Sequence, residues 1–236
     1  MDLSAIESYV GQLTNDPNHD RYTTSDIGTE LDNAQDFWNV SAKILKDTVT
    51  LTVVDGTRQY AISSLTGTPI AFTRTTHKGL ELKKRDKSWM DLYSGVDWTT
   101  TTGTPTDYII EVTDPDTQYI TLYPTPGGND AGAYLVVEYI KRHTTLSAST
   151  DTPFNGNTLL VPYHDGLGKD VAARLLGRDS SPENSLKIYG PDGKSGYAGY
   201  AKDVLSQVVD TFKALERSEP AQLRRWGTNW SRKWAY

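Results

Sequence analysis

The stretch SDIGTELDNAQDFWNVSAKILKDTVTLTVV, residues 25–54, changes its hydrophobic period part-way along. Steps of three and four residues predict an amphipathic helix that Ser25 or Asp26 caps and that runs to about Lys46. The residues at these steps are Ile27, Leu31, Ala34, Trp38, Ala42 and Leu45. From Thr48 onward, apolar residues alternate with threonine, which is typical of a β-strand. A helix therefore leads directly into a β-rich region.

Strand patterns continue to Tyr139. The Asp55-Gly56 turn signal predicts a hairpin that returns along residues 58–62. Further strands are expected at 69–75, 80–84, 108–112, 119–123 and 134–139, with one helical turn at 88–93 and a polar loop at 99–104. The strands 108–112 and 119–123 are expected to form a hairpin through Asp114-Pro115-Asp116. This spacing favours an antiparallel sandwich or an open barrel.

Helical patterns occupy both ends of the chain. A first helix is expected at 3–13, with Ser4 and Glu7 at the spacing of a capping box. Helical periodicity returns near Pro162, and Ser181-Pro182-Glu183 predicts a short helix with proline in its first turn. The longest helix is expected at 196–217. Its apolar stripe consists of Tyr197, Tyr200, Ala201, Val204, Leu205, Val208, Val209, Phe212 and Leu215.

The expected fold class is therefore α+β. Helices from both termini would pack with a central antiparallel β-sandwich or open barrel, and an extended C-terminal arm would follow. We expect N-terminal helices in 1–47, a β-rich insert in 48–145, C-terminal helices in 146–217 that complete the helical domain, and the arm in 218–236.

Composition excludes several classes of protein. The 236 residues include no cysteine, so disulfides and thiolate chemistry are excluded, and the absence fits synthesis in a reducing cytosol. Residues 1–22 carry Asp2 and Glu7 without an apolar run, which is unlike a signal peptide. No apolar run approaches the length of a membrane helix, about 18 residues. The net charge of −6 argues against general binding of nucleic acid.

Motifs for catalysis or cofactor binding are not recognisable. The histidines His19, His77, His143 and His164 lack partners at metal-ligand spacing, and we expect them to be polar surface residues. Gly193-Lys194-Ser195 resembles the end of a phosphate-binding loop, but Ile188 stands where its first glycine is required. We therefore expect no catalytic residue, no metal ligand and no cofactor. A pair of carboxylates that meet only in space stays open.

The C-terminal segment is the most unusual part of the sequence. Trp226, Trp230 and Trp234 recur every four residues, which would form one stripe on a helix. The basic residues around this stripe are Arg224, Arg225, Arg232 and Lys233, and Tyr236 ends the chain. Tryptophan and arginine are enriched at interface hot spots, so these eight residues are the candidate partner-binding residues. The alternatives are a tail folded back on its own core, or contact with a membrane surface or nucleic acid.

Charge and aromatic content also bear on whether the protein binds a partner. Residues 217–236 contain five basic residues and one acidic residue, a net charge of +4, so the other 216 residues carry −10. The chain has 14 Tyr and 6 Trp but only 4 Phe. Such amphipathic rings suit surfaces that a partner covers, and an aromatic sandwich core would explain them equally well.

The order of these segments resembles the head-to-tail adaptor, or connector, proteins of tailed bacteriophages. The resemblance covers about residues 25–215 and depends on the series rather than on one motif. The series is GTRQYAI at 56–62, GTPTDY at 103–108, ITLYPTP at 120–126, LVVEY at 135–139, a helix led by Pro162 with Leu167 and Ala172, and the long last helix.

The resemblance implies a non-enzymatic structural subunit of the virion neck. Such subunits form a ring, commonly twelve-fold, that docks on the portal protein, extends the DNA channel and gives tail or further neck proteins a platform. It also implies synthesis in the host cytoplasm, passage of genomic DNA without sequence-specific binding, and no membrane partner. An acidic body fits a channel to which DNA does not adhere. The alternatives are a carbohydrate-binding β-sandwich module, another tail or neck protein, and a hydrolase with an unrecognised site.

Overall fold

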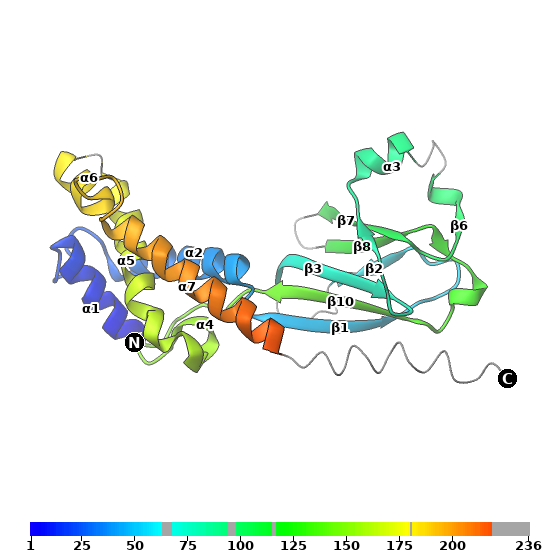
Figure 1. Cartoon of the computed structure of the whole chain (residues 1–236), viewed down its shortest axis with the longest axis horizontal. Coiled ribbons are helices and arrows are strands. Elements are labelled where there is room, and N and C mark those ends of the chain that lie inside the picture. The colour runs from blue at the N-terminus through cyan, green and yellow to red at the C-terminus, as the bar shows by residue number, and fades with distance from the viewer. Residues whose placement is uncertain (63–67, 94–97, 115–116, 180, 219–236) are drawn as a thin grey trace. The chain divides into compact units, whose positions relative to one another are not determined.

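The order of elements follows the change of period in the sequence, with helices at both ends and strands between them (Figure 1). The computed structural model describes residues 1–62, 68–93, 98–114, 117–179 and 181–218. The chain divides into two compact units. The helical unit comprises Met1–Ile44 together with the chain from His143 onward, and the β unit comprises Leu45–Arg142.

The helical unit is built around one central helix, α5. Its elements are α1 (Leu3–Thr14), α2 (Thr24–Ala42), α4 (Pro153–Gly156), the 3-10 helix η4 (Thr158–Tyr163), α5 (His164–Gly177), α6 (Pro182–Tyr189) and α7 (Tyr197–Ser218). Helices α1, α2, α6 and α7 all pack against α5. Two glycines of α5 permit close contacts with its neighbours, because a Cβ on Gly166 would lie 2.5 Å from Val204 and one on Gly168 would lie 2.7 Å from Tyr9.

The caps of the first two helices differ from those expected. Asp2, rather than Ser4, caps α1, and its carboxylate accepts a hydrogen bond from the backbone N–H of Ala5. Thr23 caps α2 and forms a capping box with Asp26, so neither Ser25 nor Asp26 is the cap itself. In each case the residue with the extended backbone lies two or three positions earlier than the pattern indicated.

Helix α2 also ends earlier than the expected Lys46. Lys43 adopts the left-handed conformation at φ 54° and closes the helix after Ala42. Lys46 then begins strand β1. The prediction failed because Leu45 continues the helical spacing although it already belongs to the β unit.

The β unit is a sandwich of two four-stranded sheets. The first sheet has the order β1-β10-β3-β4 and the second has the order β2-β8-β7-β5. The strands are β1 (Lys46–Thr52), β2 (Gln59–Ala61), β3 (Pro69–His77), β4 (Leu80–Glu81), β5 (Lys83–Lys84), β7 (Asp107–Asp114), β8 (Thr117–Tyr123) and β10 (Tyr134–Lys141). All pairs in these sheets are antiparallel except β5 with β7.

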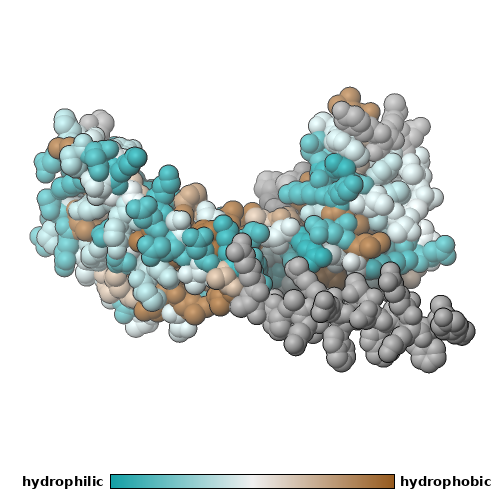
Figure 2. Space-filling model, in the orientation of Figure 1, coloured by the Kyte–Doolittle hydropathy of each residue, from teal (hydrophilic) through white to brown (hydrophobic). Residues whose placement is uncertain are grey.

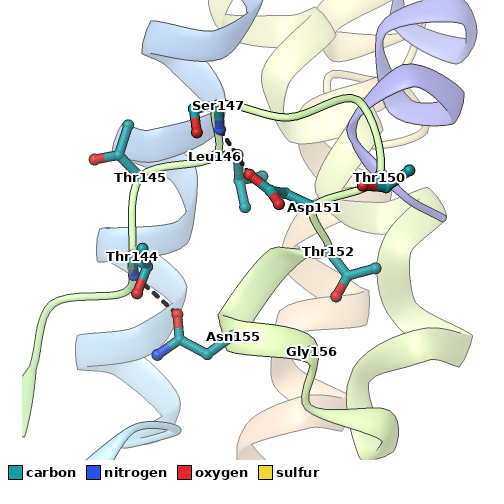
Figure 3. A pocket seen from close by; sticks show the side chains of 9 residues that line it. All are labelled: Thr144, Thr145, Leu146, Ser147, Thr150, Asp151, Thr152, Asn155 and Gly156. Carbon is teal, nitrogen blue, oxygen red and sulfur yellow. Dashed lines mark hydrogen bonds between the residues drawn. The ribbon is translucent and has the colours of Figure 1, made fainter.

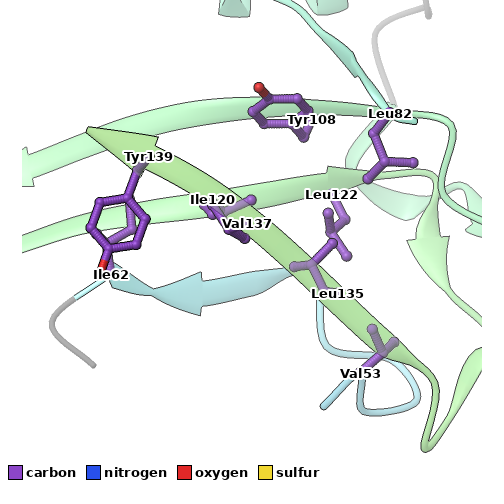
Figure 4. Packing of buried hydrophobic residues seen from close by; sticks show 9 residues of the cluster. All are labelled: Val53, Ile62, Leu82, Tyr108, Ile120, Leu122, Leu135, Val137 and Tyr139. Atoms are coloured by element: carbon purple, nitrogen blue, oxygen red, sulfur yellow. The ribbon is translucent and has the colours of Figure 1, made fainter. Parts of the chain in front are cut away.

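The core of the β unit lies between the two sheets (Figure 4). Alternate residues of β10, which are Leu135, Val137 and Tyr139, face Ile120 and Leu122 from the second sheet. Each of these five side chains is at most 1% exposed. On the other face of the second sheet, Ile109 joins a smaller cluster with Met90 and Trp98. The α+β class expected from the sequence is confirmed.

The expected β1–β2 hairpin is wrong. Asp55-Gly56 does form a turn, but β1 pairs with β10 and β2 pairs with β8, so the chain crosses between the sheets there. The expected single strand at 80–84 is likewise divided, because β4 belongs to the first sheet and β5 to the second. Buried Leu82 lies at this crossing, and its backbone N–H donates to the carbonyl of Thr75.

The other strand predictions are confirmed with small changes. Strands β7 and β8 pair as expected, although Pro115-Asp116 of their connection lies outside the described residues. The expected helical turn is α3 (Lys87–Tyr93). The expected polar loop at 99–104 instead contains a 3-10 helix, Trp98–Thr100, and a short strand β6 (Thr102–Gly103) that pairs with β9 (Thr125–Pro126). A further 3-10 helix spans Gly128–Asp130.

Candidate interaction surfaces

The residues predicted to bind a partner all lie outside the described residues. They are Arg224, Arg225, Trp226, Trp230, Arg232, Lys233, Trp234 and Tyr236. The described chain ends at Ser218, which is also the last residue of α7. The described body offers three other candidate surfaces, which are a set of exposed apolar residues on the helices, a polar groove and a basic sheet edge. It also contains three buried histidines.

Exposed apolar side chains occur on several elements of the helical unit. Helix α2 exposes Phe37 by 53% and Val40 by 43%, and these residues share one face at a spacing of three. The 3-10 helix η4 exposes Leu159 by 51% and Val161 by 54%. Helix α6 exposes Leu186 and Tyr189, and α7 exposes Tyr200 and Leu215. Figure 2 shows apolar residues gathered on the lower side of this unit, close to the position of α4 in Figure 1.

Several of the sequence-predicted α7 residues are only partly covered. Ala201, Val204 and Val208 are buried as the helical period predicts. Leu205, Val209 and Phe212 are half-buried, and Leu215 is 43% exposed. The stripe on α7 is therefore longer than the surface of the helical unit that covers it.

A polar groove of about 490 Å³ lies in the loop between the β unit's last strand and α4 (Figure 3). The groove is lined by Thr144, Thr145, Leu146, Ser147, Thr150, Asp151, Thr152, Asn155 and Gly156. The side-chain oxygen of Asn155 accepts a hydrogen bond of 2.8 Å from the backbone N–H of Thr144. Backbone N–H groups of Ala148 and Ser147 donate to Asp151, and these bonds lower the pKa of its carboxyl.

The backbone of this groove is held in an unusual conformation. Phe154 and Asn155 both have positive φ, at 54° and 55°, and Gly156 follows at 74°. The side chain of Gln35 accepts a hydrogen bond of 2.8 Å from the backbone N–H of Phe154, which fixes the loop to α2. The groove offers hydroxyls and amides to a neighbour but brings together no pair of groups suited to acid–base catalysis.

A second groove, of about 520 Å³, follows the edge of the sandwich where β4 passes into β5. Phe72, Leu82 and Tyr108 contribute apolar surface, and Arg74, Lys83 and Lys84 contribute positive charge. Arg74 lies 3.4 Å from a Glu81 oxygen, so its charge is partly balanced. Exposed lysines on an edge strand also prevent unwanted strand pairing, which suffices to explain Lys83 and Lys84.

Three of the four histidines contradict the expectation of surface residues. His77, His143 and His164 are at most 5% exposed. His77 lies 3.1 Å from buried Asp130, and His143 lies 2.9 Å from Asp32 and 3.1 Å from Asp36. Burial opposes ionisation of Asp130, but hydrogen bonds from Lys78 and His77 outweigh it and lower the pKa of its carboxyl.

These partners lie far away in the sequence, with 111 positions between Asp32 and His143 and 53 between His77 and Asp130. No local spacing could therefore have indicated them. In each case a buried histidine lies within hydrogen-bond distance of one or two carboxylates, and buried polar groups are usually paired in this way. Within the described residues, no group of three or more acidic, histidine or cysteine side chains is placed to hold a metal ion. None of the helices in this part of the chain combines the length and apolarity that crossing a membrane requires.

Comparison with known proteins places the chain in a family. The family model of the SU10 adaptor protein matches residues 1–220, which includes both units and stops within the segment after α7. No curated protein matches the chain. The match confirms the resemblance to phage head-to-tail adaptors that the order of segments indicated. The chain therefore belongs to the SU10 adaptor protein family and is a structural adaptor component of a phage particle.

Proposed function

We propose that this protein is a subunit of the ring that joins the head of a tailed phage to its tail. In this role it docks on the portal protein, extends the DNA channel and forms the platform to which tail or further neck proteins attach. The observation that supports the proposal is the family match over residues 1–220. The ring is twelve-fold, the subunit is made in the host cytoplasm, and its contribution is binding rather than catalysis.

Surfaces of the helical unit support a role in assembly. A closed ring requires two different faces on each subunit, because every copy contacts its two neighbours through different surfaces. The exposed pairs Phe37 with Val40 and Leu159 with Val161 lie on different elements and offer apolar contact area. Neither described groove is an enclosed apolar pocket of the kind that binds a small molecule.

The segment 218–236 acts in this proposal as an assembly arm. Its three tryptophans provide apolar anchors, and its basic residues match an acidic or carbonyl-lined receptor on the portal. The helical unit from which the arm departs is acidic, since residues 1–44 and 143–218 contain 17 acidic and 10 basic residues. Its negative charge discourages adsorption of the passing DNA, which fits contact without sequence-specific binding.

The test is mass analysis of the purified protein, alone and mixed with the portal protein of the same phage. We expect a ring-sized complex with the portal. The complex should be lost when residues 219–236 are removed, and also when Trp226, Trp230 and Trp234 are all replaced by alanine. A matched variant with Leu92→Ser, which alters a 78% exposed residue of the β unit, should assemble normally.

The separate outcomes distinguish the parts of this proposal. Assembly by the truncated protein would overturn the role of the arm and leave the adaptor ring in place. A full-length protein that forms no complex with the portal would overturn portal docking itself. In that case, saccharide binding by the monomer becomes the alternative to measure.

A further inference from the structure

Helix α7 contacts η4 as well as α5. The hydroxyl of Tyr200 donates to Asp165 at 2.6 Å, and the hydroxyls of Thr211 and Tyr163 lie 3.3 Å apart. Helices α7 and α5 are therefore antiparallel, and Thr211 already lies level with the residue before α5 begins. The 3-10 helix η4 therefore packs against α7 at Thr211.

Apolar side chains lie close in sequence to the contact between α7 and η4. The contact between Thr211 and Tyr163 joins α7 to η4; Leu215 follows Thr211 by four residues in α7, and Leu159 precedes Tyr163 by four residues in η4. Leu159, Val161 and Leu215 are exposed by 51%, 54% and 43%, and Phe212 is half-buried. We name these four residues the α7–η4 surface.

The arm begins at this surface. Only three residues separate Leu215 from Glu219, the first residue after the described chain. From Ser218 to Trp226 the chain has eight residues, a reach of up to about 28 Å when extended. The arm is therefore long enough to turn back over the residues at which it starts.

The arm and the helical unit are complementary in charge and in apolar character. Residues 219–236 contain four basic residues and one acidic residue, a net charge of +3, whereas the helical unit up to Ser218 carries −7. Asp203 and Asp210 on α7 are exposed and form no ion pair within the described part of the chain. Three tryptophans left in water would expose several hundred Å² of apolar area, so a nearby apolar surface on an acidic unit is favourable for them.

We propose that in the free subunit residues 219–236 dock on the α7–η4 surface of their own chain. Docking in the same chain is favoured over docking on a second copy because a short connection gives a high effective concentration. This storage of the arm concerns the subunit before assembly and does not depend on portal binding. It would keep the tryptophans covered until a partner competes for them.

The experiment is limited trypsin digestion of the full chain, in which cleavage at Arg224 and Arg225 is followed by mass spectrometry. Trypsin can cut a docked arm only while the arm is detached from the surface. A substitution that weakens docking therefore raises the rate of cleavage. The double variant Leu159→Asp with Val161→Asp should be cut about tenfold faster than the unaltered protein. The matched control Leu186→Asp, at a 59% exposed site on α6, should be cut at the unaltered rate.

A second variant leaves the folded body unchanged. Replacing Trp230 and Trp234 with alanine should accelerate cleavage as much as the double variant on η4 does. Equal cleavage rates in the unaltered protein, both docking variants and the control would overturn the proposal. Protection that fades when the protein is diluted a hundredfold would also overturn it, because the arm would then dock on a second copy. None of these outcomes depends on whether the subunit binds the portal protein.

Discussion

His164 lies inside the helical unit with a charged group against its ring. His164 is 1% exposed, and its Nδ1 lies 2.8 Å from the amino nitrogen of Met1. Burial is the main reason that the pKa of His164 falls from 6.5 to about 4, and the positive charge of the amino group lowers it further. The site therefore disfavours the protonated imidazole.

This depression makes folding stability depend on pH in a defined window. Below pH 6.5 the unfolded chain binds a proton at His164 that the folded chain does not bind until about pH 4. The stabilisation is complete above pH 6.5 and is lost as the pH falls through this window. The shift corresponds to a loss of at most about 3 kcal/mol in the free energy of unfolding.

The predicted loss is measured by urea unfolding of the unaltered protein and of the His164→Asn variant at pH 7 and pH 4.5. We expect the variant to lose less stability than the unaltered protein over this interval, because asparagine does not titrate. Between pH 7 and pH 8 the two proteins should change equally. An identical loss of stability in both proteins from pH 7 to pH 4.5 would show that His164 does not determine the acid response.

At the scale of elements, the contact between α5 and α7 depends on the missing side chain of Gly166. A Cβ there would lie 2.5 Å from Val204 Cγ1, closer than real side chains approach. Gly166→Ala should destabilise the protein by about 1–3 kcal/mol, because overpacking outweighs the better helix propensity of alanine. Thermal or urea unfolding measures this change.

Gly28 in α2 is the matched control for this prediction. No atom lies within 4 Å of the position of its Cβ, so Gly28→Ala should stabilise the protein by about 0.5–1 kcal/mol. The two substitutions are chemically the same and should have opposite signs. Adding Val204→Ala to Gly166→Ala should restore part of the loss. If Gly166→Ala also stabilises the protein, the close packing of α5 on α7 is wrong.

The same elements show what the sequence could predict. Periodicity predicted the helices and most strands because the spacing of apolar residues shows which side of an element is buried. In α7, for example, Ala201, Val204 and Val208 are buried at the helical spacing. Strand pairing was wrong at β1 and β2, since a turn at Asp55-Gly56 does not determine which sheet the next strand joins. The groove at 144–156 went unnoticed, because its shape depends on positive φ at Asn155 and also at Phe154, a bulky residue that rarely adopts it.

At the scale of the whole molecule, the β unit is an insertion whose two ends lie side by side. Strands β1 and β10 are antiparallel neighbours, with Lys46 opposite Ile140. The side chain of Lys141 donates to Asp47 at 3.0 Å, and the N–H of Lys141 donates to the carbonyl of Leu45. The chain therefore enters and leaves the β unit at nearly the same point.

This arrangement predicts that each unit folds without the other. Deleting 45–142 and joining Ile44 to His143 through two glycines should leave a helical protein with a cooperative unfolding transition, because paired strand ends are only about 5 Å apart. The contact of His143 with Asp32 would still anchor the returning chain. The fragment 45–142 should also fold, since both sheets that face its core come from within it. Circular dichroism and urea unfolding measure both pieces. A non-cooperative transition in either piece would mean that this unit needs the other one in order to fold.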